Sequence, residues 1–333
     1  MSEQFQNLHK FPQAAQFGDA YTALVCGAVG LQPTAQAFIR NMNRVRGIGA
    51  LSMNLMAVGM VNEAARVEAL FNKKINPHDP RVTHNHPQFD EDLFSEVNEE
   101  RKRLINAWIK SYPRKEDFAL ALAAKTAFNM NVVLDESIGE AWSAIQATMA
   151  AMLISLWTAF ESLAQDTWIT TVNLRPEPLA TRVLNRNADL GTGTQLKAIP
   201  QDQITGHGFD LRNSMGDILF RLRAVDFQQL KTIRRAYKVA FDGQLESIFE
   251  AHEIELLRLE AVRNLFVHKG GVIDRKFVER MGNESAFKDR IGHTLAVNGE
   301  FVADKANVVS VCSTQLIQAV DKWLLNNHDD QST

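Results

Sequence analysis

Residues 141–160 read AWSAIQATMAAMLISLWTAF, a run of twenty positions without a charged side chain. A run of this length is sufficient to cross a bilayer. However, five polar side chains interrupt it, and Glu140 and Glu161 flank it where Lys or Arg would anchor a membrane helix. A helix packed against other helices on most sides has the same composition. We therefore predict that residues 137–172 form the central buried helix of a bundle, and we expect no membrane partner.

Apolar residues recur at helical spacing on both sides of this run. Further helices are expected at 34–74, 94–111, 116–129, 210–223, 226–241, 244–269 and 305–326. Residues 76–92 hold three prolines and three histidines, which predicts a loop. Residues 272–278 and 294–303 alternate like strands, and Asn298-Gly299 is a typical turn pair, so a short β-hairpin is expected there. The predicted fold class is mainly all-α.

Composition sets the broad class of the protein. The chain has 333 residues, is 45% hydrophobic and 23% charged, and carries a formal net charge of -3. We expect an N-terminal helical region at 1–135, of unknown role, followed by a helical domain at 136–328. A chain with this net charge needs a local basic patch to bind nucleic acid. Two distant cysteines exclude a disulfide framework, and the N-terminus does not resemble a secretory signal, so a cytoplasmic location is expected.

One stretch carries a clear chemical signal. Residues 258–271 read RLEAVRNLFVHKGG, and the pair of glycines marks the end of the helix. Asn264 and His268 are four residues apart and share a helix face, and Arg263 can reach the same side. An arginine gives forked hydrogen bonds to phosphate oxygens, an asparagine orients a phosphate or ribose oxygen, and a histidine can move a proton near neutral pH. This set suits a phosphodiester substrate.

The spacing alone also fits a solvated helix end with a capping histidine. A looser Arg-to-His spacing is expected about once by chance in a chain of this length and composition, and a second copy begins at Arg81 in the proline-broken loop, where we assign it no role. The tight form, Arg-Asn-x-x-x-His, is far rarer and occurs here at the end of a long helix.

The ordering of elements around this motif resembles the HEPN superfamily. The resemblance covers residues 137–327: an upstream helix with LWTAFESLAQDTWITTVN, the helix ending RNLFVHKGG, then VIDRKFV, the hairpin-like stretch and a closing helix. It implies a bundle of four to five helices that forms a homodimer, so that two motif helices face each other. In active members it also implies metal-independent cleavage of RNA by the ribose 2′-hydroxyl.

The resemblance assigns Arg263, Asn264 and His268 as catalytic residues, and Glu161 more loosely as a polar residue of the first helix. Many HEPN domains are inactive and serve as scaffolds that bind a nucleotide or a partner protein, so this alternative stays open. A toxin-like or phage-defence role, with an antitoxin or defence partner, or a role in RNA processing would use the same chemistry.

Other candidate residues carry weaker signals. Lys269 adjoins the motif, and Arg234 and Arg235 belong to a basic run that either faces solvent or follows an RNA backbone. Three histidines at positions 78, 84 and 86 have no companion ligands in the sequence, so a solvated loop is the better interpretation. Neither a P-loop nor a dinucleotide-binding glycine pattern is present. No metal and no cofactor are expected.

Overall fold

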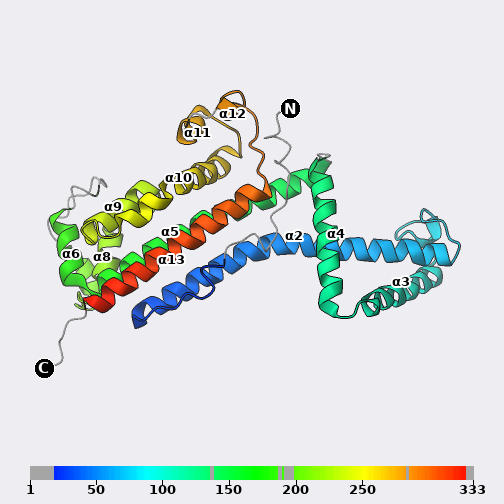
Figure 1. Cartoon of the computed structure of the whole chain (residues 1–333), viewed down its shortest axis with the longest axis horizontal. Helices are drawn as coiled ribbons and strands as arrows, with labels where there is room; N and C mark the ends of the chain where they lie inside the picture. The colour runs from blue at the N-terminus through cyan, green and yellow to red at the C-terminus, as the bar shows by residue number, and fades with distance from the viewer. Residues whose placement is uncertain (1–18, 136–138, 187–189, 191–198, 283–284, 328–333) are drawn as a thin grey trace. The chain divides into compact units, whose positions relative to one another are not determined.

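A computed structural model describes residues 19–135, 139–186, 190, 199–282 and 285–327. Within these ranges the protein is all-α (Figure 1). The β structure found there is an isolated antiparallel bridge between Val272 and Thr294. The helices are η2 (Val29–Leu31), α2 (Gln32–Asn72), η3 (Pro80–Val82), α3 (Glu91–Ser111), α4 (Lys115–Asp135), α5 (Gly139–Leu174), α6 (Pro176–Asn185), α7 (Gln201–Gly206), α8 (Met215–Arg221), α9 (Leu230–Ala240), α10 (Glu246–Lys269), α11 (Arg275–Arg280), α12 (Ser285–Lys288) and α13 (Gly299–Asn326).

The described residues divide into two compact units. The motif unit, as we call it, combines residues 19–48 with residues 146–327, and the second unit comprises residues 49–145. The boundary predicted at 135/136 lies near the later division, at 145/146. The earlier division, at 48/49, lies inside α2, where the helical pattern runs on without a break that the sequence would reveal.

In the motif unit, α5 is tied to α9 by two buried hydrogen bonds. The indole Nε1–H of Trp168 donates to the carbonyl of Ala236 at 3.2 Å, and the hydroxyl of Tyr237 donates to the carbonyl of Ala164 at 2.8 Å. Both aromatic side chains are almost completely buried. Each bond satisfies a polar group that burial would otherwise leave unpaired, so the bonds fix α9 against α5 at low cost.

The closing helix α13 packs along α10. Lys305 of α13 is 2% exposed and forms an ion pair with Glu255 of α10, which also pairs with Arg258. Burial tends to raise the pKa of Glu255, but these two cations lower it below its usual value. Just before α13, the side-chain amide of Gln146 both accepts from the N–H of Val297 and donates to its carbonyl. These contacts link α13 to α10 and the start of α13 to α5.

The expected β-hairpin is not confirmed, and among the described residues its two stretches meet at the isolated antiparallel bridge between Val272 and Thr294. The side chain of Asn298 accepts the N–H of Phe301 and starts α13, so Asn298-Gly299 is a helix N-cap and not a hairpin turn. The carboxylate of Asp274 accepts the N–H of Phe277 in the same way and starts α11 within the stretch expected to be a strand. An Asn or Asp side chain serves a turn and an N-cap equally well, and here the cap prevails in both places.

The second unit has a small core of its own. Its buried side chains come from the later part of α2, from η3 and from α3: Ala65, Ala69, Leu70, Val82, Val97 and Leu104. The segment expected to be a loop contains η3, where Asp79 caps the turn through its contact with the N–H of Arg81. His84 stacks on Phe89 with ring centroids 4.8 Å apart.

Helix α5 meets the length and composition of a membrane span. Among the described residues this is the case for one stretch, Trp142–Leu174, half of whose most apolar window is buried within the structure. A core helix of a folded bundle passes the same test, and Met149, Leu153 and Trp157 are fully buried here. The absence of a membrane partner and the cytoplasmic location stay predictions.

Candidate functional site

The motif lies in the last two turns of α10, and a glycine pair ends the helix. Gly270 adopts the left-handed conformation with φ 59°, and the N–H of Gly271 reaches back to the carbonyl of Leu265 at 3.2 Å. Gly271 also has a positive φ of 82°, and a Cβ at this position would lie 2.9 Å from the ring of Phe266. The two glycines therefore allow a turn that returns the chain from α10 to α11.

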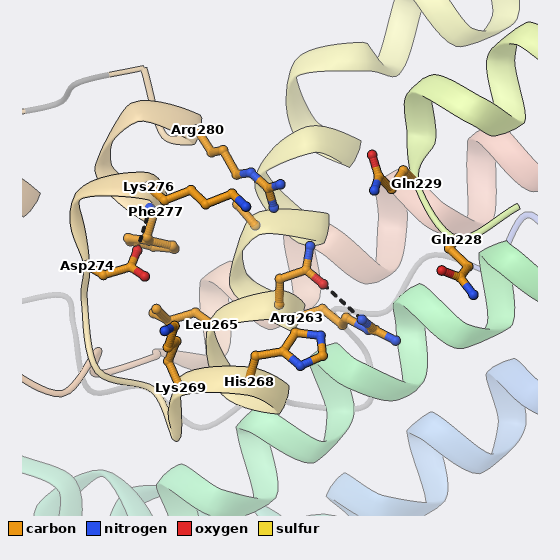
Figure 2. A pocket seen from close by; sticks show the side chains of 12 residues that line it. Gln228, Gln229, Arg263, Leu265, His268, Lys269, Asp274, Lys276, Phe277 and Arg280 are labelled. Atoms are coloured by element: carbon orange, nitrogen blue, oxygen red, sulfur yellow. Dashed lines mark hydrogen bonds between the residues drawn. The ribbon is translucent and has the colours of Figure 1, made fainter. Parts of the chain in front are cut away.

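A pocket of about 280 Å³ opens at this turn (Figure 2). Its walls come from α10, from α11 and from the two residues before α9. The lining residues are Gln228, Gln229, Ala261, Arg263, Asn264, Leu265, His268, Lys269, Asp274, Lys276, Phe277 and Arg280. The three motif residues and Lys269, all expected from the sequence, thus line one pocket.

Arg263 and Asn264 interact with each other directly. Nη1 of Arg263 donates to Oδ1 of Asn264 at 2.9 Å (Figure 2). The Nε of Arg263 is buried and has no hydrogen-bond partner in the described structure. The side-chain oxygen of Asn264 thus orients the guanidinium of Arg263, while the side-chain NH₂ group of Asn264 stays available to a ligand. The sequence had suggested that Asn264 orients a phosphate or ribose oxygen, and the structure adds its contact with Arg263.

Glu161 lies on α5 in the electrostatic neighbourhood of Arg263. Burial raises the pKa of Glu161, and the positive charge of Arg263 opposes that shift. Asp226 and Glu260 add smaller effects that raise the pKa further. Glu161 is not among the pocket-lining residues. Glu161 is therefore better described as a carboxylate that interacts with Arg263 than as a group that touches the ligand.

The charge of the pocket is strongly positive. His268, Lys269, Lys276 and Arg280 are exposed at its walls, and Arg263 is half-buried. Asp274 is the single carboxylate in the lining, and its Oδ1 accepts the N–H of Phe277. Within the described ranges none of the four lysines and arginines of this lining forms an ion pair with a carboxylate. This arrangement favours an anionic ligand.

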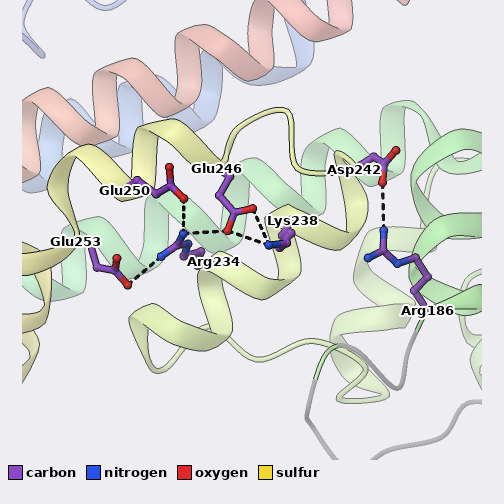
Figure 3. A network of polar contacts seen from close by, with 7 residues as sticks. All are labelled: Arg186, Arg234, Lys238, Asp242, Glu246, Glu250 and Glu253. Carbon is purple, nitrogen blue, oxygen red and sulfur yellow. Dashed lines mark hydrogen bonds and ion pairs between the residues drawn. The ribbon is translucent and has the colours of Figure 1, made fainter.

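Arg234 has the opposite surroundings. Its guanidinium forms ion pairs with Glu246, Glu250 and Glu253 of α10, at 2.9, 2.9 and 2.8 Å (Figure 3). Neither Arg234 nor Arg235 lines the motif pocket. A phosphate would have to displace three carboxylates to reach Arg234, so we leave this residue and its neighbour out of the proposed site.

The sequence did not suggest Lys276, Arg280, Gln228 or Gln229 as site residues. Lys276 and Arg280 are four residues apart on α11, a helix that the strand-like pattern concealed. The signal that would have revealed them is Asp274, an N-cap residue directly before RKFVER. Gln229 precedes α9, where it forms a capping box with Thr232.

Metal ligands are not gathered at this site. Among the described residues, no group of three His, Cys, Asp or Glu side chains is placed so that it could hold a metal ion. Comparison with models of known protein families, with characterised proteins and with solved structures finds no match to this chain. The functional argument therefore rests on the pocket and on the motif.

Proposed function

We propose that this protein is a metal-independent endoribonuclease of the HEPN type. The observation that carries the proposal is the pocket at the end of α10, which joins the arginine, asparagine and histidine of the motif to further unpaired cations. The all-α fold and the buried α5 beside α10 agree with the helical bundle that the HEPN resemblance implies.

The residues suggest a definite chemistry. The 2′-hydroxyl of one ribose attacks the adjacent phosphorus, and the bond from phosphorus to the 5′-oxygen of the next nucleotide breaks. The products are a 2′,3′-cyclic phosphate and a free 5′-hydroxyl. His268 gives its proton to the leaving 5′-oxygen, and Arg263 stabilises the negative charge that grows on the phosphoryl oxygens. His268 of the partner subunit would accept the proton of the attacking hydroxyl.

A second copy of the chain is part of this proposal. Ile254 is 67% exposed and Leu257 is 40% exposed, although both belong to the apolar residues of α10. Ile254, Leu257, Asn264 and His268 follow one another at spacings of three, seven and four, so they lie along one side of the helix. Contact between two such faces would bring two motifs together. Light scattering should therefore show a homodimer, and a strict monomer at micromolar concentration would favour the scaffold alternative.

The direct test is RNA cleavage in excess EDTA, with analysis of the product ends. We expect cyclic phosphate ends from the wild type, and a rate about 10² to 10⁴ lower for His268→Ala because the proton-transfer group is lost. His268 is exposed, so melting should barely change. If His268→Ala cleaves RNA as fast as the wild type, the catalytic site is not at His268. If EDTA abolishes cleavage and a divalent ion restores it, the metal-independent mechanism is refuted.

The alternative function is that of an inactive HEPN scaffold that binds a nucleotide or a partner protein. The same basic pocket would hold a nucleotide phosphate without cutting it. A wild type that cleaves no RNA of any kind would make this the better account. The toxin-like, phage-defence and RNA-processing roles, with an antitoxin or defence partner, differ in biological context and not in the chemistry of the pocket.

A further inference from the structure

Two cations of the pocket come from α11 and not from the helix that carries the motif, and they have no role in the proposed cleavage step. They are Lys276 and Arg280 of α11, and both line the pocket with exposed side chains. Figure 2 shows them extending from α11 toward one side of the pocket, while Arg263 and His268 lie on another side. The pocket therefore has two separate cationic regions.

The local sequence explains why these two side chains act together. A spacing of four residues places Lys276 and Arg280 on the same face of α11. The helix is anchored between them by Phe277, which also lines the pocket, is 3% exposed and meets the ring of Phe287 edge-on, with centroids 5.5 Å apart. Ile273, just before α11, exchanges backbone hydrogen bonds with Gly292 and His293. The helix is thus held as a support for the two cations.

Free cations gathered around a small pocket repel one another, and they are stabilised when an anion enters. Other cations of the motif unit are paired: Arg234 and Lys238 meet glutamates of α10, and Lys305 meets Glu255. Lys276 and Arg280 make no such pair in the part of the chain that the structure describes. A ligand with a single phosphate at Arg263 and His268 would leave this second cationic region unused.

We propose that Lys276 and Arg280 form a second phosphate subsite, which binds the phosphodiester next to the one at Arg263 and His268. This inference rests on the proposed function. It makes the preferred substrate an RNA strand with at least two consecutive phosphodiesters, and it assigns Lys276 and Arg280 to substrate positioning. Gln228 and Gln229 line the same pocket, so they face the nucleotide that joins the two phosphates.

The test measures binding without cleavage. A fluorescein-labelled, single-stranded 2′-O-methyl RNA lacks the attacking hydroxyl, so anisotropy reports its affinity for the full chain. Unlabelled 2′-O-methyl competitors with one or two phosphodiesters then compare the subsites. We expect the wild type to bind the two-phosphate competitor about tenfold more tightly, as one charged hydrogen-bonded contact would give. Lys276→Gln with Arg280→Gln should abolish that preference. The plot of log affinity against log salt should also become shallower by about 0.7 for the lost phosphate contact.

The matched control is Arg275→Gln with Lys288→Gln. It removes the same charge from α11 and α12, at exposed residues that do not line the pocket, and it should keep the preference. The charge-conserving double variant Lys276→Arg with Arg280→Lys should retain most of the preference for the two-phosphate competitor. Circular dichroism checks that all variants are folded.

The outcomes separate the two proposals. A lost preference in the double variant, together with no cleavage of ordinary RNA, supports the subsite and contradicts the ribonuclease. If the wild type cleaves RNA but binds the one-phosphate and two-phosphate competitors equally well, the subsite is contradicted and the ribonuclease proposal is not. The same preference in the wild type and the double variant, or its loss in the control, also overturns the subsite. Failure to bind any RNA overturns both proposals.

Discussion

Two basic regions of the motif unit use their cations in opposite ways. On the face shared by α9 and α10, Arg234 is held by three glutamates, and Lys238 meets Glu246, one of the three (Figure 3). In the pocket at the end of α10, Lys269, Lys276 and Arg280 have no carboxylate partner among the described residues. In the sequence only the region of Arg234 looked like a basic run, whereas Lys269 was noted because it adjoins the motif. Neutralisation by neighbouring carboxylates, and not the number of cations, marks one region as structural and the other as a candidate for binding.

The largest effect should separate the two regions by function. Arg263→Ala should lower the cleavage rate by about 10² to 10³, because the growing phosphoryl charge loses its forked donor. Arg263→Lys should restore little, since an ammonium cannot reproduce the planar fork. Single-turnover cleavage of a labelled RNA measures both variants.

The matched arginine variant is Arg234→Ala. It leaves three glutamates of α10 without their common partner, so the free energy of unfolding should fall by about 1 kcal/mol while cleavage stays within a few-fold. Chemical denaturation gives the stability of both variants. If Arg234→Ala loses cleavage as strongly as Arg263→Ala does, the distinction between the regions fails.

The second prediction concerns the turn that brings α11 to the pocket. Gly271→Ala places a side chain at φ 82° and a Cβ against the Phe266 ring, so we expect a loss of about 1–3 kcal/mol in stability and weaker RNA binding. Gly243→Ala is the control, because its φ is 77° but the nearest atom to a new Cβ is 4.0 Å away, at Glu246. The control should destabilise less and should leave RNA affinity intact. Equal RNA affinity for Gly271→Ala and the wild type would separate the turn from binding.

The smallest effect concerns Glu161. Burial raises the pKa of Glu161, so folding favours the protonated carboxyl, and the stability that it gives is lost as the pH rises through the folded-state pKa. Glu161→Gln should therefore melt higher than the wild type at neutral pH. The difference should vanish below about pH 4, where the carboxyl is protonated in both states. A lower melting temperature at neutral pH would show that attraction to Arg263 outweighs the cost of burial.

Much of the helical fold could be predicted because the apolar spacing is regular. The helix expected at 244–269 is α10 (Glu246–Lys269), and the one expected at 137–172 is α5 (Gly139–Leu174). The short helices α6, α7, α11 and α12 were not predicted, and two of them show a physical reason. Helix α6 begins at Pro176, and a proline usually marks the end of a helical pattern although it is well tolerated in the first turn of a helix. Six residues in α11 are too few to show a helical period.

The site was partly predictable for a related reason. Asn264 and His268 are close because helix geometry alone brings them together, so their spacing is visible in the sequence. The positions of Lys276 and Arg280 depend on the glycine turn and on an unrecognised cap. The partners of Arg234 lie twelve to nineteen residues further along, on another helix, and their approach depends on the packing of α9 against α10.

The discontinuity of the motif unit has a consequence for how the protein is made. Its residues 19–48 are separated from the remainder by the second unit, and the N–H groups of Gly27 and Ala28 donate to the carboxylate of Asp321 in α13. Contacts across nearly three hundred residues form late, because the chain between them must be closed first. On the ribosome, α10 emerges before the helix that buries its flank. The motif unit is therefore completed only after α13 has been synthesised, so until then a nascent chain carries the motif on a helix that still lacks one of its packing partners.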